Sequence, residues 1–197
     1  MSYFTFEGAS GNDEISSYEL FLQYPQYDGF RLNGNDGDDN LSLSIMGRMG
    51  FDQANGGRGN DFMSGSAYMT DYASMLFAGG EGTDEVYFPG GTITDIKRVD
   101  STLTEVTVVD SNDGSKLTAV ISDDVEIVSY GEVAYLTEDI AKGRVRPVEF
   151  DEIWFRAYND NADWYVKGLD TYAAYHYPSE PTPVTPIPVA PSPEPTP

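Results

Sequence analysis

Apolar and polar residues alternate along short stretches in the first half of the chain, and each stretch is followed by a glycine-rich segment. The apolar members of these stretches are Phe4 and Phe6, Phe30 and Leu32, Ala54, and Met75 and Phe77. Beyond one glycine-rich segment the alternation resumes at Leu41, Leu43 and Ile45. A period of two predicts strands that turn alternate side chains inward. The residues expected to fill the interior are Phe4, Phe30, Leu41, Met63 and Phe77.

The glycine-rich segments are four copies of one nine-residue pattern, G-G-x-G-x-D-x-U-x, in which U is a large apolar residue. They occupy Gly8–Ser16, Gly34–Ser42, Gly56–Ser64 and Gly79–Tyr87. Their starts at 8, 34, 56 and 79 are 26, 22 and 23 residues apart, and a repeat of this length predicts a stacked or solenoidal architecture. We expect each coil to contain a strand, a glycine turn, a second strand and a variable loop, with loops over 18–29, 46–50 and 68–74.

The residue types of the repeat suit metal binding. Glycine at positions one, two and four permits positive φ and lets backbone carbonyls crowd inward. Aspartate at position six adds a hard anionic oxygen, and calcium takes about six to eight oxygen ligands in a tolerant geometry. One turn supplies too few ligands, so we expect each ion to lie between two adjacent turns. Ordinary Asn-Asp-Gly turns between strands are the alternative, which four copies in register disfavour. The candidate metal ligands are Gly8, Gly11, Asp13, Gly34, Gly37, Asp39, Gly57, Gly59, Asp61, Gly80, Gly82 and Asp84.

With this motif the chain resembles the repeat-in-toxin (RTX, hemolysin-type) family of calcium-binding β-roll proteins, closely over residues 1–90 and less closely over 91–140. The resemblance implies a right-handed parallel β-roll with calcium between successive turns, in proteins exported from bacteria. It implies no activity, because such rolls flank toxins, proteases, lipases and adhesins alike. Family rolls often carry motifs on both edges. Each coil here has one, so we expect calcium along one edge and irregular loops along the other. Ala9 and Asn35 replace the second glycine in the first two copies, which bears on how tightly those turns close.

From residue 91 onward the strands become longer and the repeat ends. Strands are expected over 93–99, 103–109, 116–121, 125–130 and 133–136, with a hairpin turn at Asn112-Asp113-Gly114. Residues 91–147 look like the region that closes many RTX rolls, in which a hairpin precedes a stretch such as Val125-Glu126-Ile127-Val128. We interpret them as a β cap that buries the open end of the roll formed by residues 1–90. Asp123 and Asp124 could ligate an ion, but a solvated turn is the favoured interpretation.

Two further segments follow the expected cap. Apolar residues in 148–177 recur at helical spacing and predict a small aromatic helical segment; they include Phe150, Ile153, Trp154, Ala157 and Tyr158. Nine of the twenty residues in 178–197 are proline, which predicts an extended polyproline tail or linker. The expected fold is therefore mainly β: a parallel β-roll or solenoid with a β cap, a small C-terminal helical segment and a proline-rich tail.

Composition and charge narrow the range of functions. The 33 acidic and 11 basic residues give a net charge of −22, which argues against nucleic acid and suits divalent cations. The chain has no cysteine, so metal is expected to brace the narrow core where disulfides cannot. No apolar run has the length of a membrane span. His176 is the only histidine, and GxSxG, HExxH and phosphate-loop motifs are absent, so we expect no enzyme activity.

Two functions remain open on the sequence. The first is a calcium-binding structural or surface module, extracellular or on a bacterial cell surface, which folds on calcium and acts as a rigid spacer or interaction scaffold. The second is a subunit of a larger assembly, such as a virion decoration or appendage protein, docked through its C-terminal segment. In both, Ca²⁺ is the expected cofactor, and a protein partner is expected to contact residues 148–197.

Overall fold

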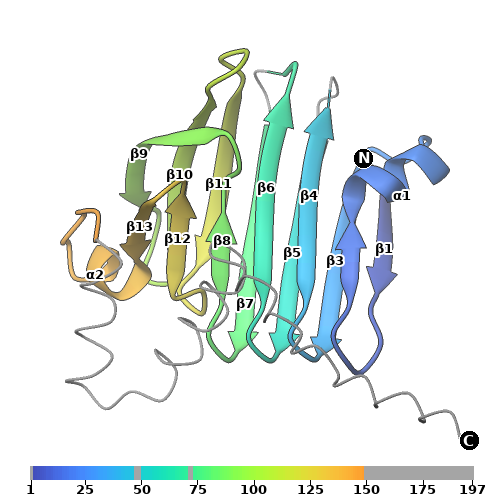
Figure 1. Ribbon diagram of the computed structural model, residues 1–197, viewed down its shortest axis with the longest axis horizontal. Helices are drawn as coiled ribbons and strands as arrows, with labels where there is room; N and C mark the ends of the chain where they lie inside the picture. The colour runs from blue at the N-terminus through green and yellow to red at the C-terminus, as the bar shows by residue number, and fades with distance from the viewer. Residues whose placement is uncertain (1, 47–49, 71–72, 149–197) are drawn as a thin grey trace, which may run out of the picture.

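The computed structural model describes residues 2–46, 50–70 and 73–148. These residues form two facing β-sheets with two short helices (Figure 1). The predicted mainly-β solenoid is confirmed. The predicted aromatic segment and proline-rich tail lie outside the described residues from 149 onward.

The two sheets differ in size. The seven strands of the larger sheet are, in spatial order, β1 (Tyr3–Glu7), β3 (Gly29–Asp36), β5 (Gly50–Arg58), β7 (Ala73–Glu81), β11 (Lys116–Ser122), β10 (Leu103–Asp110) and β9 (Gly91–Arg98). The six strands of the smaller sheet are β13 (Val133–Leu136), β12 (Ile127–Tyr130), β8 (Glu85–Tyr87), β6 (Phe62–Tyr68), β4 (Asn40–Met46) and β2 (Glu14–Ser16).

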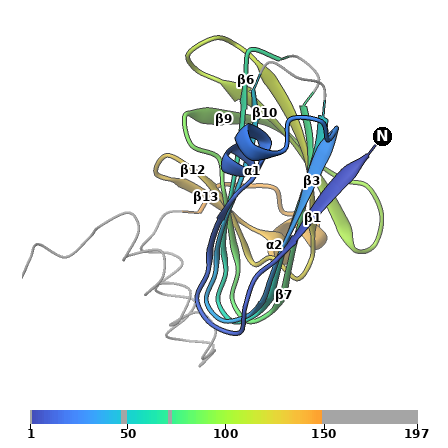
Figure 2. The same cartoon turned by 90° about the vertical axis from the view of Figure 1, so that its right-hand side faces the viewer.

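Five strand–turn–strand units build the roll: β1–β2, β3–β4, β5–β6, β7–β8 and β11–β12. The first strand of each unit lies in the larger sheet and the second in the smaller sheet, and equivalent strands of successive units pair in parallel. Viewed along the stack in Figure 2, the turns between the two strands lie over one another at one edge of the roll. We call this edge the motif edge, because the four glycine motifs lie there.

The hydrophobic core lies between the two sheets. Because side chains alternate across a strand, position eight of each motif faces inward, and positions seven and nine face outward. The inward residues Ile15, Leu41, Met63 and Val86 are all buried. The predicted interior residues Phe30, Leu41, Met63 and Phe77 are fully buried. Phe4 is half-buried because β1 is the last strand at its end of the sheet.

The edge opposite the motif edge, which we call the loop edge, is irregular. The loop expected over 18–29 is partly wrong, because helix α1 (Ser17–Gln23) opens this connection. Leu20 of α1 is buried in the core and Phe21 packs against it, so tertiary contacts hold this short helix in place. Tyr24, which follows the helix, stacks on Phe4 with 4.4 Å between ring centroids.

Residues 91–148 extend both sheets beyond the motif units. The observed strands lie within two residues of the predicted ones at each boundary, and Asn112-Asp113-Gly114 joins β10 to β11 as predicted. β10 is antiparallel to β9 and β11, and β13 is antiparallel to β12. β11 and β12, however, are parallel to β7 and β8, so they continue the roll as its fifth unit. Helix α2 (Thr137–Ala141) follows β13, and neither described helix is long and apolar enough to span a bilayer.

Candidate functional site

Glycines at motif position four let neighbouring turns approach very closely. The carbonyl oxygen of Gly37 lies 1.9 Å from the place where a Cβ atom on Gly59 would be, and that of Gly59 lies 1.6 Å from the same place on Gly82. The turns are also tied by backbone hydrogen bonds, in which the N–H of Gly37 donates to Arg58 O at 2.7 Å and that of Gly59 to Glu81 O at 2.8 Å. No side chain fits at this position inside the stack, which explains the repeated glycine.

The two motif copies without a second glycine keep their turns in different ways. Asn35 has φ of 78°, a left-handed conformation that asparagine tolerates better than most residues. Its Nδ2 donates a hydrogen bond to Gly8 O at 2.8 Å, so the side chain links two turns. Ala9 avoids positive φ, and its N–H donates to Asp13 Oδ2 at 2.6 Å. Both turns therefore remain closed.

The aspartates at motif position six form a column along the motif edge. Asp13, Asp39, Asp61 and Asp84 are in register because the strands that follow them pair in parallel. The backbone N–H groups of Asp13, Asp39 and Asp61 each donate to Oδ1 of the next aspartate in the column, at 2.7, 2.8 and 2.8 Å. Each carboxylate after the first therefore holds the backbone of the preceding coil.

A fifth carboxylate, that of Glu126, extends this column into the unit that has no glycine motif. The N–H of Asp84 donates to Glu126 Oε2 at 2.8 Å, and the N–H of Glu126 donates to Asp84 O at 3.1 Å. Sequence analysis missed this role of Glu126, although Glu126-Ile127-Val128 repeats the motif spacing, in which an acidic residue stands two positions before an inward apolar residue. We call Asp13, Asp39, Asp61, Asp84 and Glu126 the carboxylate column.

Three carboxylates of the column have an oxygen without a partner. Oδ2 of Asp39, Asp61 and Asp84 is buried and has no hydrogen-bond partner among the described residues. Asp39 Oδ2 lies 2.0 Å from the Cβ position on Gly34, and Gly56 O lies 2.5 Å from that same position. Both acceptor oxygens therefore lie close to Gly34, and the buried carboxylate oxygen needs a proton or a cation to offset its loss of solvent.

Burial controls the protonation of the column. Desolvation raises the pKa of Asp61 to about 7 and that of Asp84 to about 8 from a usual value of 3.8, and neighbouring carboxylates add to the shift. Desolvation likewise raises the pKa of Asp39, and it raises the pKa of Glu126 to about 7. None of these four groups has an ion-pair partner within the described ranges. Near neutral pH the column therefore favours bound protons or bound cations over free charge.

The donor atoms of the column are of the kind that calcium binds, because they are carboxylate and carbonyl oxygens only. Across the described part of the chain, no three His, Cys, Asp or Glu side chains are grouped so that they could hold a metal ion by themselves. An ion in the column would therefore need backbone carbonyls as well. Carbonyls of this kind lie beside the column: Gly34 O lies 2.5 Å from the Cβ position on Gly8, where Asp13 Oδ2 lies at 2.8 Å.

The structure brings all of the predicted metal ligands to the motif edge. Gly8, Gly11 and Asp13 lie at its outer end, and the other three sets are stacked between neighbours. Residues 123 and 124 form a half-exposed turn, but their side chains also bind the protein and are not free in solvent. Asp123 forms a two-pronged ion pair with Arg98, and Asp124 Oδ1 accepts the N–H of Gly79 at 3.1 Å.

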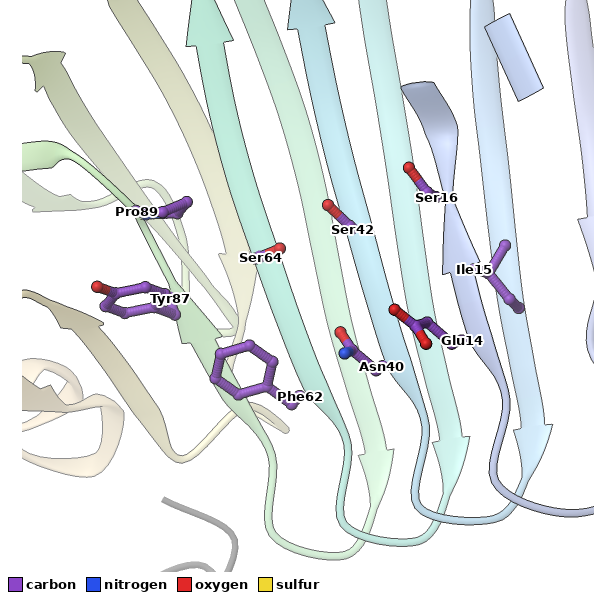
Figure 3. A pocket seen from close by; sticks show the side chains of 9 residues that line it. All are labelled: Glu14, Ile15, Ser16, Asn40, Ser42, Phe62, Ser64, Tyr87 and Pro89. Atoms are coloured by element: carbon purple, nitrogen blue, oxygen red, sulfur yellow. The ribbon is translucent and has the colours of Figure 1, made fainter. Parts of the chain in front are cut away.

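A second concave surface lies on the outer face of the smaller sheet. Figure 3 shows the outward side chains of successive strands in rows, with Ser16, Ser42 and Ser64 in one row and Tyr87 beyond them. The groove has a volume of about 450 Å³, and Glu14 is the only carboxylate among the residues that line it. These hydroxyl groups show no arrangement of nucleophile and base, so the carboxylate column is the stronger candidate site.

Comparisons with protein-family models, with curated proteins and with solved structures find no match for this chain. The resemblance to RTX proteins therefore rests on the motif residues and their spacing.

Proposed function

We propose that this chain is a calcium-binding structural module, in which ions held along the motif edge brace a narrow β-roll. The observation that carries the proposal is the set of buried, unpartnered Oδ2 atoms on Asp39, Asp61 and Asp84. Three stacked carboxylates without an ion-pair partner are costly to bury, and a divalent cation bound between turns would offset that cost.

Protons are the competing occupants of the column. Because the pKa values of Asp61 and Asp84 are raised to about 7 and about 8, neutral carboxyl groups would also relieve the repulsion at neutral pH. The glycine pattern favours calcium, because motif positions one and four place backbone carbonyl oxygens between the turns. Calcium needs these additional ligands, whereas a proton does not. A protein that needs calcium in this way suits the extracellular space or a cell surface, where the ion is abundant.

The proposed role is that of a rigid spacer or interaction scaffold. A roll braced at every turn resists bending, and the chain supplies variable loops at the opposite edge for contacts. The alternative role, as a subunit docked in a larger assembly through residues 148–197, stays a hypothesis, because that segment lies almost wholly outside the described residues.

Equilibrium dialysis of the full chain against calcium at pH 7.5 tests the proposal. Asp61 borders two gaps between motif turns and Asp13 borders one, so Asp61→Asn is expected to lose more bound calcium than the matched variant Asp13→Asn. Wild-type protein that binds no calcium, while circular dichroism shows it to be folded, would overturn the proposal.

A further inference from the structure

The carboxylate column ends at a cavity where the roll meets the residues that follow it. The cavity has a volume of about 240 Å³ and lies between the last motif turn, the turn before β12 and the start of α2. The residues that line it are Gly82, Asp123, Glu126, Leu136, Thr137 and Glu138. Five of these six residues can present an oxygen atom from a side chain or, for glycine, from the backbone.

Thr137 supplies the most telling of these oxygens. Its side chain is 1% exposed, and its Oγ1 has no hydrogen-bond partner in the described part of the protein. Its backbone is well held, because its N–H donates to Glu126 O at 3.0 Å. A buried hydroxyl without a partner costs roughly 1–3 kcal/mol. Because Thr137 is one of the residues that line the cavity, a cation bound there would offset that cost.

Glu126 and Gly82 add two oxygens of the kinds that hard cations prefer. Glu126 Oε2 accepts the N–H of Asp84, and no ion pair within the described residues neutralises this carboxylate. In the motif turns before it, the carbonyl of each position-four glycine faces the next coil, as Gly37 O and Gly59 O do. Gly82 is the last of this series, and the next coil has the cavity in place of a glycine turn.

The two other acidic side chains of the cavity already have basic partners. Asp123 pairs with Arg98, and Glu138 pairs with Lys142 at 3.1 Å. Those contacts leave Glu126 as the acidic group that lacks a cation. One bound divalent cation would neutralise the charge of Glu126 and give the Thr137 hydroxyl a partner.

We propose that this cavity, which we call the junction site, binds one calcium ion through Glu126, the Thr137 hydroxyl and the Gly82 carbonyl, with water completing the shell. This inference rests on the proposed calcium-binding function, but it uses residues outside the glycine motifs. The ion would tie the last motif turn to β12, β13 and α2, and so fasten the end of the roll.

Calcium binding by the full chain tests the junction site, with dialysis at pH 7.5 of wild type, Thr137→Val, Thr137→Ser, Glu126→Gln and Glu132→Gln. Thr137→Val keeps the side-chain shape without the hydroxyl, and Thr137→Ser keeps the hydroxyl. Glu126→Gln keeps an acceptor for the Asp84 N–H, and Glu132→Gln removes one exposed charge from the turn between β12 and β13 as a control.

We expect Thr137→Val to weaken one site by about tenfold, as loss of a supporting metal contact does, and Thr137→Ser and Glu132→Gln to bind like wild type. Glu126→Gln should lose one calcium ion per chain. Circular dichroism in calcium and in chelator confirms that each variant is folded.

Two results would overturn the junction site. If Thr137→Val and Glu126→Gln bind as much calcium as wild type while Asp61→Asn binds less, the motif edge binds calcium and the junction does not. If Thr137→Ser is as weak as Thr137→Val, the methyl group and not the hydroxyl matters, and the proposed ligand is wrong. A wild type that binds no calcium overturns the proposed function together with this inference.

Discussion

The motif edge and the loop edge of the roll join the same strands, yet they follow opposite rules. At the motif edge each turn has the same nine-residue spacing, and carbonyl oxygens approach neighbouring glycines so closely that no Cβ fits. At the loop edge the connections differ in length, and the first is long enough to contain α1. The variation in repeat length, 26, 22 and 23 residues, is therefore absorbed at the loop edge. In this chain, repeats of unequal length keep the motif edge regular because the loop edge varies.

The largest expected effect comes from filling the glycine space at the motif edge. Gly59→Ala would bring Cβ to 1.9 Å from Gly37 O, so we expect it to lower the free energy of unfolding by more than about 4 kcal/mol, as measured by urea unfolding in calcium. Gly11→Ala is the matched control, because Gly11 has the same motif position and a similar φ, with nothing within 4 Å of its Cβ position. Equal losses in the two variants would mean that the turns do not stack as described.

The next effect is a dependence of metal-free stability on pH. Asp61 and Asp84 have pKa values raised to about 7 and about 8 in the folded state, above the 3.8 of the unfolded chain. Because the folded state binds these protons more tightly than the unfolded chain does, the two groups contribute their full stabilisation of the folded state below about pH 4. That stabilisation is lost as the pH rises toward 8. In chelator we expect the free energy of unfolding to fall by a few kcal/mol between pH 5 and pH 8. Urea unfolding at a series of pH values measures this. A stability that rises over this range would show that the column is not desolvated.

A smaller effect separates an inner member of the column from the outer one. In chelator at pH 8, Asp61→Asn removes a buried charge and keeps an oxygen for the Asp39 N–H, so we expect it to be about 1–2 kcal/mol more stable than wild type. Asp13→Asn lies at the open end and should change stability little. In calcium the order should reverse, with Asp61→Asn less stable than wild type. Thermal unfolding of both variants under the two conditions tests this. A stabilised Asp61→Asn in calcium would mean that Asp61 binds no ion.

The smallest effects are expected at the loop edge. Leu22 on α1 is 62% exposed and Met69 is 71% exposed, so Leu22→Ser and Met69→Gly should each change stability by less than about 0.5 kcal/mol. Leu20→Ala, on the buried face of the same helix, should cost about 2 kcal/mol or more. Chemical denaturation of the three variants provides the comparison. A large loss from Leu22→Ser would show that the loop edge is as constrained as the motif edge.

Sequence predicted most at the motif edge, where the close stacking of the turns restricts which residues fit. The spacing of glycine, aspartate and apolar residue locates Asp39, Asp61 and Asp84 because the backbone leaves that turn few alternatives. Alternation also located the strands after residue 91 within two residues. The repeat does not predict that β11 and β12 join the roll in parallel, because pairing between strands so far apart in sequence leaves no local signal.

The same limit explains the two residues that sequence analysis missed. Glu126 enters the carboxylate column through the pairing of Ile127 with Glu85, not through a motif of its own. Thr137 becomes a candidate ligand only because β13 folds back on β12 and places it beside Gly82. The loop over 18–29 was predicted without its helix because contacts of Leu20 and Phe21 with the core stabilise α1, and so short a segment shows little helical periodicity.

Thermal unfolding of the full chain at pH 7.5, followed by circular dichroism in calcium, in magnesium and in chelator, tests the central claim most directly. Binding of ligand to the folded state alone adds about 4 kcal/mol at a thousandfold excess over the dissociation constant. We therefore expect calcium to raise the unfolding temperature well above its value in chelator, and magnesium to do so far less because it prefers a stricter octahedral geometry. An unfolding temperature that is the same in calcium and in chelator would contradict the claim that calcium braces the motif edge.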